Sequence, residues 1–167
     1  MARSVEPSRR GAALVAATAV AAALLCALPG RGQATGEDAR ASAVRELIEL
    51  YFRTWSARDM ERYGRCFLPQ AAIQFVDPQG RLTTMPLRRF LASQIEGHRA
   101  SEAGMTETPE SIDVRLEGRV ARVLVFWKLL AGERVEHGYD HFTLLESDGQ
   151  WRIAHLIFYA TPESERP

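Results

Sequence analysis

One acidic residue, Asp140, lies in a stretch that otherwise alternates like a half-buried β-strand. The stretch runs from Tyr139 to Glu146, and Asp140 shares its face with Phe142 and Leu144, because successive side chains of a strand point to opposite faces. This spacing aims a carboxyl group at the core. A carboxylate in an apolar interior stays protonated, acquires a partner or performs chemistry. Asp140 is therefore the first candidate functional group, although it could equally serve only to satisfy a polar core.

The histidines and the short sequence motifs reduce the number of reaction types that the protein could catalyse. The only two histidines at i, i+4 spacing, His137 and His141, fall on a predicted strand and not on a helix, so they would lie about 13 Å apart. The sequence has no phosphate-binding glycine loop, no nucleophile elbow and no Cys-His pattern. We therefore expect no metal and no cofactor, which leaves proton transfer or binding alone.

Three helices are predicted to position these groups. Apolar residues at helical spacing predict a long amphipathic helix from about Glu37 to Ser56. Asp59 can cap a short second helix that Pro69 ends. Pro86 suits the first position of a third helix, which ends near His98.

The rest of the chain has the alternation of strands. A strand is predicted from Ala71 to Val76, and a polar loop from Ala100 to Glu110. The later strands, joined by glycine-containing turns, are predicted at Ile112 to Leu116, Val120 to Leu130, Arg134 to Glu146 and Trp151 to Tyr159. We predict an α+β cone, in which three N-terminal helices pack on a curved antiparallel sheet of four to five strands and enclose a pocket.

This order of elements, with Asp148-Gly149-Gln150-Trp151 before the last strand, resembles the superfamily built like nuclear transport factor 2 (NTF2), which includes the SnoaL-like domains. The resemblance covers nearly all of residues 35–167. It implies a cone-shaped fold. Because that superfamily contains enzymes, binding modules and subunit-pairing domains, the resemblance leaves the function open.

Within that superfamily, local sequence is most similar to ketosteroid isomerase. Tyr51 precedes Asp59 by eight residues, as does the tyrosine on the first helix of the isomerase. Asp140-His141-Phe142 resembles the strand motif that carries the protonated aspartate of that family. The resemblance implies that Tyr51 and Asp140 form an oxyanion hole. The alternative for Tyr51, on an apolar helical stripe, is core packing.

Asp77 is the candidate general base. Asp77-Pro78 resembles the base motif of the isomerase, yet by direct spacing from Phe67 it is Phe75 that occupies the position of the base. Either the intervening turn has two extra residues, or the base is absent and the site binds enols and phenols without turnover. As a third reading, Asp77 before Pro-Gln-Gly is simply a turn residue.

The expected ligand is small and apolar. We predict that it is contacted by Trp55, Phe75, Trp127, Phe142 and His155. As an enzyme, the protein would shift a proton next to a carbonyl. As a carrier, it would hold a polyketide-, steroid- or lumazine-sized molecule. As a dimerising accessory domain, it would have a cone plugged by Trp55, Phe75 and Trp127.

The strand from Val120 to Leu130 is apolar on both faces, and such a strand needs a second covering layer. Since helices can cover only one face, we predict a homodimer packed through the outer face of the sheet.

The first 34 residues read as a cleaved signal peptide. A basic start precedes the apolar run from Ala12 to Leu28, and small residues precede a predicted cleavage site after Ala34. We therefore expect export, by the general or the twin-arginine route, with an uncleaved membrane anchor as the alternative. Removal takes away four arginines and one glutamate, which leaves 17 basic and 20 acidic side chains. We expect no nucleic-acid partner for this weakly acidic domain.

Overall fold

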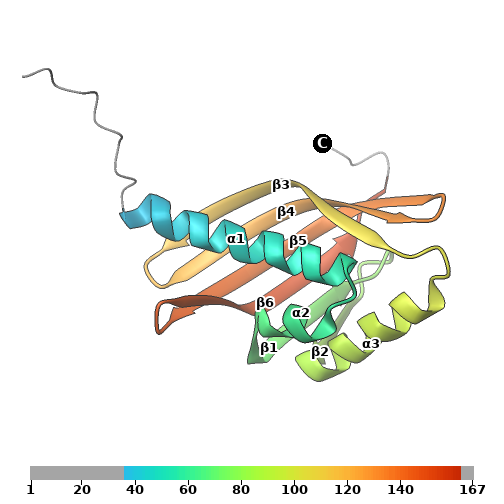
Figure 1. Ribbon diagram of the computed structural model, residues 1–167, viewed down its shortest axis with the longest axis horizontal. Helices are drawn as coiled ribbons and strands as arrows, with labels where there is room; N and C mark the ends of the chain where they lie inside the picture. The colour runs from blue at the N-terminus through green and yellow to red at the C-terminus, as the bar shows by residue number, and fades with distance from the viewer. Residues whose placement is uncertain (1–35, 163–167) are drawn as a thin grey trace, which may run out of the picture. The chain divides into compact units, whose positions relative to one another are not determined.

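The computed structural model describes residues 36–162, which fold around one mixed sheet. The helices and strands in this range are α1 (Gly36–Ser56), α2 (Met60–Arg65), β1 (Phe67–Val76), β2 (Leu82–Pro86), α3 (Leu87–Ala100), β3 (Thr106–Glu117), β4 (Val120–Ala131), β5 (Arg134–Ser147) and β6 (Gln150–Ala160). The strand order is β2-β1-β6-β5-β4-β3. Figure 1 shows α1 crossing one face of this sheet, with α2 and α3 beside β1 and β2.

The long first helix and the cap of the second are confirmed. α1 buries one stripe against the sheet because its apolar residues recur every three or four positions. Asp59 caps α2, since its side chain accepts a hydrogen bond from the backbone N–H of Arg62 at 3.1 Å. The buried residues of α1 are Val44, Ile48, Tyr51, Phe52, Thr54 and Trp55.

The prediction of three N-terminal helices is wrong, because β1 and β2 precede α3. β2 pairs antiparallel with β1 as an edge strand. It has no signal in the sequence because only Met85 is even half-buried, so no alternation of polar and apolar residues marks it. Pro86, predicted as the first helical residue, precedes the helix as its N-cap.

The prediction of an entirely antiparallel sheet of four to five strands is also wrong. Six strands form the sheet, and β1 runs parallel to β6, with Ile73 opposite Leu156. No turn joins these two strands, so local sequence does not reveal their relative direction. β1 also begins at Phe67, before Pro69, because the register shifts between Phe67 and Ala72, where a proline can be tolerated.

Two further register shifts decide which side chains face the helices. One lies between Pro109 and Ser111 where β3 pairs with β4, and the other between Thr143 and Leu144 where β5 pairs with β6. Each shift reverses the alternation of faces along its strand. As a result, Glu107 faces the helices.

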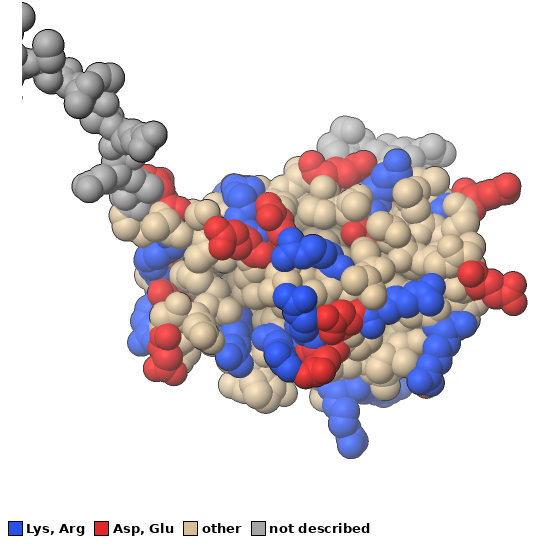
Figure 2. All heavy atoms as spheres, viewed as in Figure 1, with Lys and Arg blue, Asp and Glu red and all other residues tan. Residues whose placement is uncertain are grey.

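The surface on the side of α1 carries interspersed acidic and basic side chains (Figure 2). Within residues 36–162, no helix is both long enough and apolar enough to span a membrane. The predicted signal peptide and its cleavage site, in residues 1–34, lie outside the described residues.

Candidate functional site

A cavity of about 340 Å³, here called the inner cavity, lies among α1, α3 and the inner face of the sheet. Four aromatic side chains form much of its wall: Trp55, Phe75, Trp127 and Phe158. Three of these four were predicted to contact a ligand. Because these three side chains line an open space, the structure does not show the plugged cone that we expect for a dimerising accessory domain.

Four polar side chains also line the inner cavity: Gln94, Glu107, Arg134 and Glu136. Arg134 and Glu136 form an ion pair with each other. The indole N–H of Trp55 donates to Gln94 Oε1 at 2.8 Å, which leaves the amide N–H groups of Gln94 as donors. Ser56 fixes the backbone of Glu107, because its Oγ donates to the Glu107 carbonyl at 3.0 Å and accepts from the Glu107 N–H at 2.9 Å. The end of α1 thus places Glu107 in the cavity wall.

Asp140 is 2% exposed and faces the helices from β5, as predicted. Trp127 Nε1 donates to Asp140 Oδ1 at 2.9 Å. Among the described residues, Oδ2 has no hydrogen-bond partner. Burial raises the pKa of Asp140 to about 7, against the lowering effect of the Trp127 bond and of the nearby Tyr51 hydroxyl. Only the Trp127 contact has the geometry of a hydrogen bond. Asp140 is therefore part protonated near neutral pH.

Gly138 makes room for the indole that holds Asp140. A Cβ atom at this position would lie less than 3.0 Å from both Trp127 Cζ2 and the Tyr159 carbonyl oxygen. Since real Cβ atoms do not approach other atoms so closely, only glycine allows Trp127 to lie against β5 and reach Asp140.

Tyr51 lies close to Asp140, as the proposed oxyanion hole requires. Its ring centroid is 4.8 Å from that of Tyr63 and 5.1 Å from that of Phe142. Burial, and then the charge of Asp140, raise the pKa of Tyr51. However, Tyr51, Asp140 and Phe142 are core residues that do not line the inner cavity. Trp127 connects the two regions, because it lines the cavity and bonds to Asp140.

Glu107 forms an electrostatic pair with Asp140. Burial, and then the charge of Asp140, raise the pKa of the Glu107 carboxyl group. A negative charge on Asp140 therefore opposes a negative charge on Glu107. A buried carboxyl group with a raised pKa in a cavity wall can stay protonated and donate a hydrogen bond to a ligand.

The structure does not place Asp77, the predicted general base, beside Glu107 and Asp140. It sits in the turn between β1 and β2, where Oδ1 accepts from the N–H groups of Gln79 and Arg81, both at 2.9 Å. Its Oδ2 accepts from Arg81 Nε at 2.7 Å. The backbone bond from Arg81 is the main cause of a lowered pKa for Asp77. Val76 and Pro78 line the inner cavity, but Asp77 does not, so its geometry is that of a turn residue.

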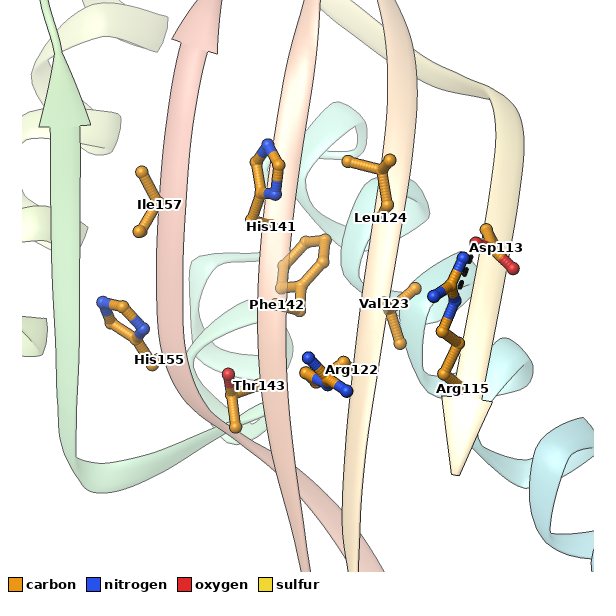
Figure 3. Close-up of a pocket in the computed structure, with 10 residues that line it drawn as sticks. All are labelled: Asp113, Arg115, Arg122, Val123, Leu124, His141, Phe142, Thr143, His155 and Ile157. Atoms are coloured by element: carbon orange, nitrogen blue, oxygen red, sulfur yellow. Dashed lines mark ion pairs between the residues drawn. The ribbon is translucent and has the colours of Figure 1, made fainter. Parts of the chain in front are cut away.

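His155, also predicted to contact the ligand, lies instead on the outer face of the sheet. Its Nε2 is 2.9 Å from Gln74 Oε1. Figure 3 shows it, together with His141 and Arg122, lining a groove of about 330 Å³ on the face turned away from the helices. The irregular pairing of β5 with β6 explains this placement, because it lets Ile153 and Leu156 face inward while His155 faces outward.

The main residue that sequence reasoning missed is Glu107. Extending the alternation backwards from Ile112 places Glu107 on the outer face, and the register shift before Ser111 reverses this. The alternating threonines at 106 and 108 were a weak signal of an earlier strand start. No group of three His, Cys, Asp or Glu side chains within residues 36–162 could hold a metal ion.

Comparison with known proteins gives a family and a fold. Residues 39–159 match the family described as "Putative lumazine-binding". No curated protein has significant sequence similarity to the chain.

Solved structures of NTF2-like proteins share the fold at low identity. An NTF2-like protein of unknown function from Shewanella baltica is 21% identical, with a TM-score of 0.58 over 75% of this chain and 96% of that one. One from Pseudomonas putida is 17% identical, with a TM-score of 0.64 over 76% and 90%. A protein from Novosphingobium aromaticivorans named as a putative scytalone dehydratase is 16% identical, with a TM-score of 0.62 over 74% and 85%. These structures confirm the predicted NTF2-like fold.

Proposed function

This chain belongs to the "Putative lumazine-binding" family, and we propose that it binds a flat, largely apolar small molecule in the inner cavity, with Glu107 as the ionisable group that meets the ligand. The observation that carries the proposal is the position of Glu107 in the wall of a 340 Å³ cavity that has four aromatic side chains. Ligand sites commonly combine apolar walls with a few placed polar groups.

The cavity wall indicates the class of ligand. Trp55, Phe75, Trp127 and Phe158 offer ring faces and edges, which favour contacts with a flat aromatic or conjugated system. The amide of Gln94 and the carboxyl of Glu107 offer hydrogen bonds to a polar edge of that molecule. A two- or three-ring compound with a carbonyl, enol or ring N–H group, of the size of a lumazine or a small polyketide, fits this description.

A second candidate function is cofactor-free proton transfer next to a carbonyl. It is favoured by the position of the Glu107 carboxyl group in the cavity wall, where burial raises its pKa and so strengthens it as a base once it is ionised. In this reaction Glu107 takes the proton from the carbon beside the carbonyl and returns it to a second carbon of the conjugated system. Tyr51 and Asp140 take part as oxyanion donors only if Trp127 moves, since neither lines the cavity.

The test is a fluorescence titration of the purified protein with 2-naphthol. We expect saturable binding that Trp127→Ala weakens about tenfold or more, because loss of a buried aromatic contact costs about 1.5–3 kcal/mol. Glu107→Gln should change the pH dependence of binding, whereas Glu110→Gln, an exposed site on the same strand, should not. Binding that is indifferent to both Trp127→Ala and Glu107→Gln would reject the inner cavity as the site.

We also propose a homodimer through the outer face of the sheet. The face carries exposed apolar side chains, from Leu124 and Leu145 at 38% to Leu130 at 42% and Val135 at 44%. His141 and Tyr159 add a stacked aromatic pair with ring centroids 5.8 Å apart. Apolar area of this kind on a sheet face favours a second layer. Sedimentation at micromolar concentration should give twice the chain mass, and Leu124→Glu should give the monomer; a monomeric wild type would exclude this dimer.

Export remains a proposal that rests on residues 1–34 of the sequence. We expect a cleaved protein with Thr35 as its first residue outside the cytoplasm. Mass spectrometry of the protein from fractionated cells tests this, and an intact chain in the cytoplasmic fraction would contradict it.

A further inference from the structure

A second cavity, of about 320 Å³, lies beside the ends of α1 and α3 and the start of α2. Its walls are Arg58, Met60, Ile95, His98 and Arg99, none of which lines the inner cavity. We call it the lateral cavity. It combines two cations, two apolar side chains and one buried imidazole.

His98 is the buried polar group of the lateral cavity. It is 4% exposed, and neither ring nitrogen has a hydrogen-bond partner within residues 36–162. Burial, and then the charge of Arg58, lower the pKa of His98, although the nearby Trp55 carbonyl acts in the opposite direction. A neutral imidazole offers one donor and one acceptor. Since buried polar groups almost always have partners, an unpaired imidazole in a cavity wall indicates a ligand that supplies one.

The charges around the cavity favour a single negative charge on that ligand. Neither Arg58 nor Arg99 has a carboxylate within ion-pair distance among the described residues. The nearest acid in the sequence, Asp59, accepts a hydrogen bond from the backbone N–H of Arg62 and forms an ion pair with the Arg62 side chain.

The helix ends reduce this positive charge without cancelling it. α1 and α3 both end beside the cavity, and each helix C-terminus carries roughly half a negative charge. Two guanidinium groups against two such ends leave about one positive charge in excess. A monoanion balances that excess, whereas a dianion such as phosphate exceeds it.

The apolar part of the wall selects among monoanions. Met60 and Ile95 are both half-buried and offer flexible apolar surface beside the cations. We propose that the lateral cavity binds a monocarboxylate with an apolar chain, its carboxylate between Arg58 and Arg99 and accepting the N–H of His98. Met60 and Ile95 contact the chain.

This site is joined to the inner cavity through Trp55. The rings of His98 and Trp55 are 4.4 Å apart, and the Trp55 indole N–H holds Gln94 in the wall of the inner cavity. A carboxylate on His98 therefore acts on the residue that orients Gln94. Any effect of a ligand in one cavity on the affinity of the other is then mutual and equal.

Calorimetric titration of the purified protein with octanoate at pH 7.5 tests the proposal. Octanoate should bind, and both acetate, which lacks the chain, and 1-octanol, which lacks the charge, should bind at least tenfold more weakly. Arg99→Gln should weaken octanoate binding about five- to tenfold, because it removes one charge-assisted contact. Arg89→Gln, an exposed arginine of the same helix, should leave the affinity unchanged.

His98→Phe keeps an aromatic ring against Trp55 and removes both nitrogens, so we expect binding about tenfold weaker. Arg99 is exposed, so Arg99→Gln remains folded and informative even where His98→Phe does not fold. Octanoate affinity equal to that of 1-octanol, or equal in wild type and Arg99→Gln, would overturn the proposal. Because 2-naphthol reports on the inner cavity, failure of that binding leaves this result unaffected.

Discussion

Replacing Asp140 with asparagine should stabilise the protein at alkaline pH. Burial raises the pKa of Asp140 from 3.8 to about 7, so the folded protein retains a proton that the unfolded chain loses between these values. Stability therefore falls as pH rises from about 4 to 7, and the whole cost is present above pH 7. At about 1.36 kcal/mol per pKa unit, this cost is up to about 4 kcal/mol.

The asparagine side chain would keep the acceptor for the Trp127 indole and could not ionise. Urea unfolding of wild type and Asp140→Asn from pH 4.5 to 8.5 measures the difference. We expect the two proteins to be close at pH 4.5, and the variant to be more stable by several kcal/mol at pH 8.5. Because the charge of Asp140 also raises the pKa of Glu107, the difference between the two proteins reports Asp140 together with its effect on Glu107. A variant that is less stable than the wild type at pH 8.5, or that shows the same pH dependence as the wild type, would refute the claim that Asp140 is a buried acid with a raised pKa.

Three further predictions concern Gly138, Trp127 and Asp77. Gly138→Ala should destabilise the fold by about 2–5 kcal/mol in urea unfolding, because the added methyl group overpacks Trp127 and breaks its hydrogen bond to Asp140. The control is Gly97→Ala in α3, where the added Cβ meets only ordinary contacts, and it should stabilise the fold by about 0.5–1 kcal/mol. Equal effects of the two substitutions would contradict the steric argument. Trp127→Phe should raise the pKa of Asp140 further, because the variant lacks the indole hydrogen bond that lowers this pKa in the wild type. Titration of the Asp140 carboxyl carbon by nuclear magnetic resonance that shows no rise in pKa would count against the hydrogen bond. Asp77→Asn should lower stability near neutral pH, with the deficit vanishing as the pH falls through the lowered pKa of Asp77; thermal unfolding that shows a pH-independent difference would contradict the turn bonds to Arg81.

Much of the scaffold was predictable because it follows local periodicity. The apolar stripe of α1, the cap at Asp59 and the alternation along β4 and β5 are all local patterns. The inward placement of Asp140 and of Trp127 follows from them, because an uninterrupted strand keeps its period of two.

What sequence did not reveal depends on contacts between distant segments. The parallel pairing of β1 with β6 joins segments about 80 residues apart, and no turn between them marks the direction. The shift between Pro109 and Ser111 changes the face of Glu107, since a displacement of one residue moves a strand's side chains to the opposite face. For the same reason the position of His155 on the outer face could be assigned only from the structure.

The most direct test of the central claim is the carboxyl carbon resonance of Glu107, followed over pH with and without saturating 2-naphthol. We predict a midpoint above 4.5 in the free protein, because burial and Asp140 oppose its charge, and a shifted midpoint when the ligand is bound. A midpoint at 4.5 that 2-naphthol leaves unchanged would contradict the assignment of Glu107 as the ionisable group of the binding site.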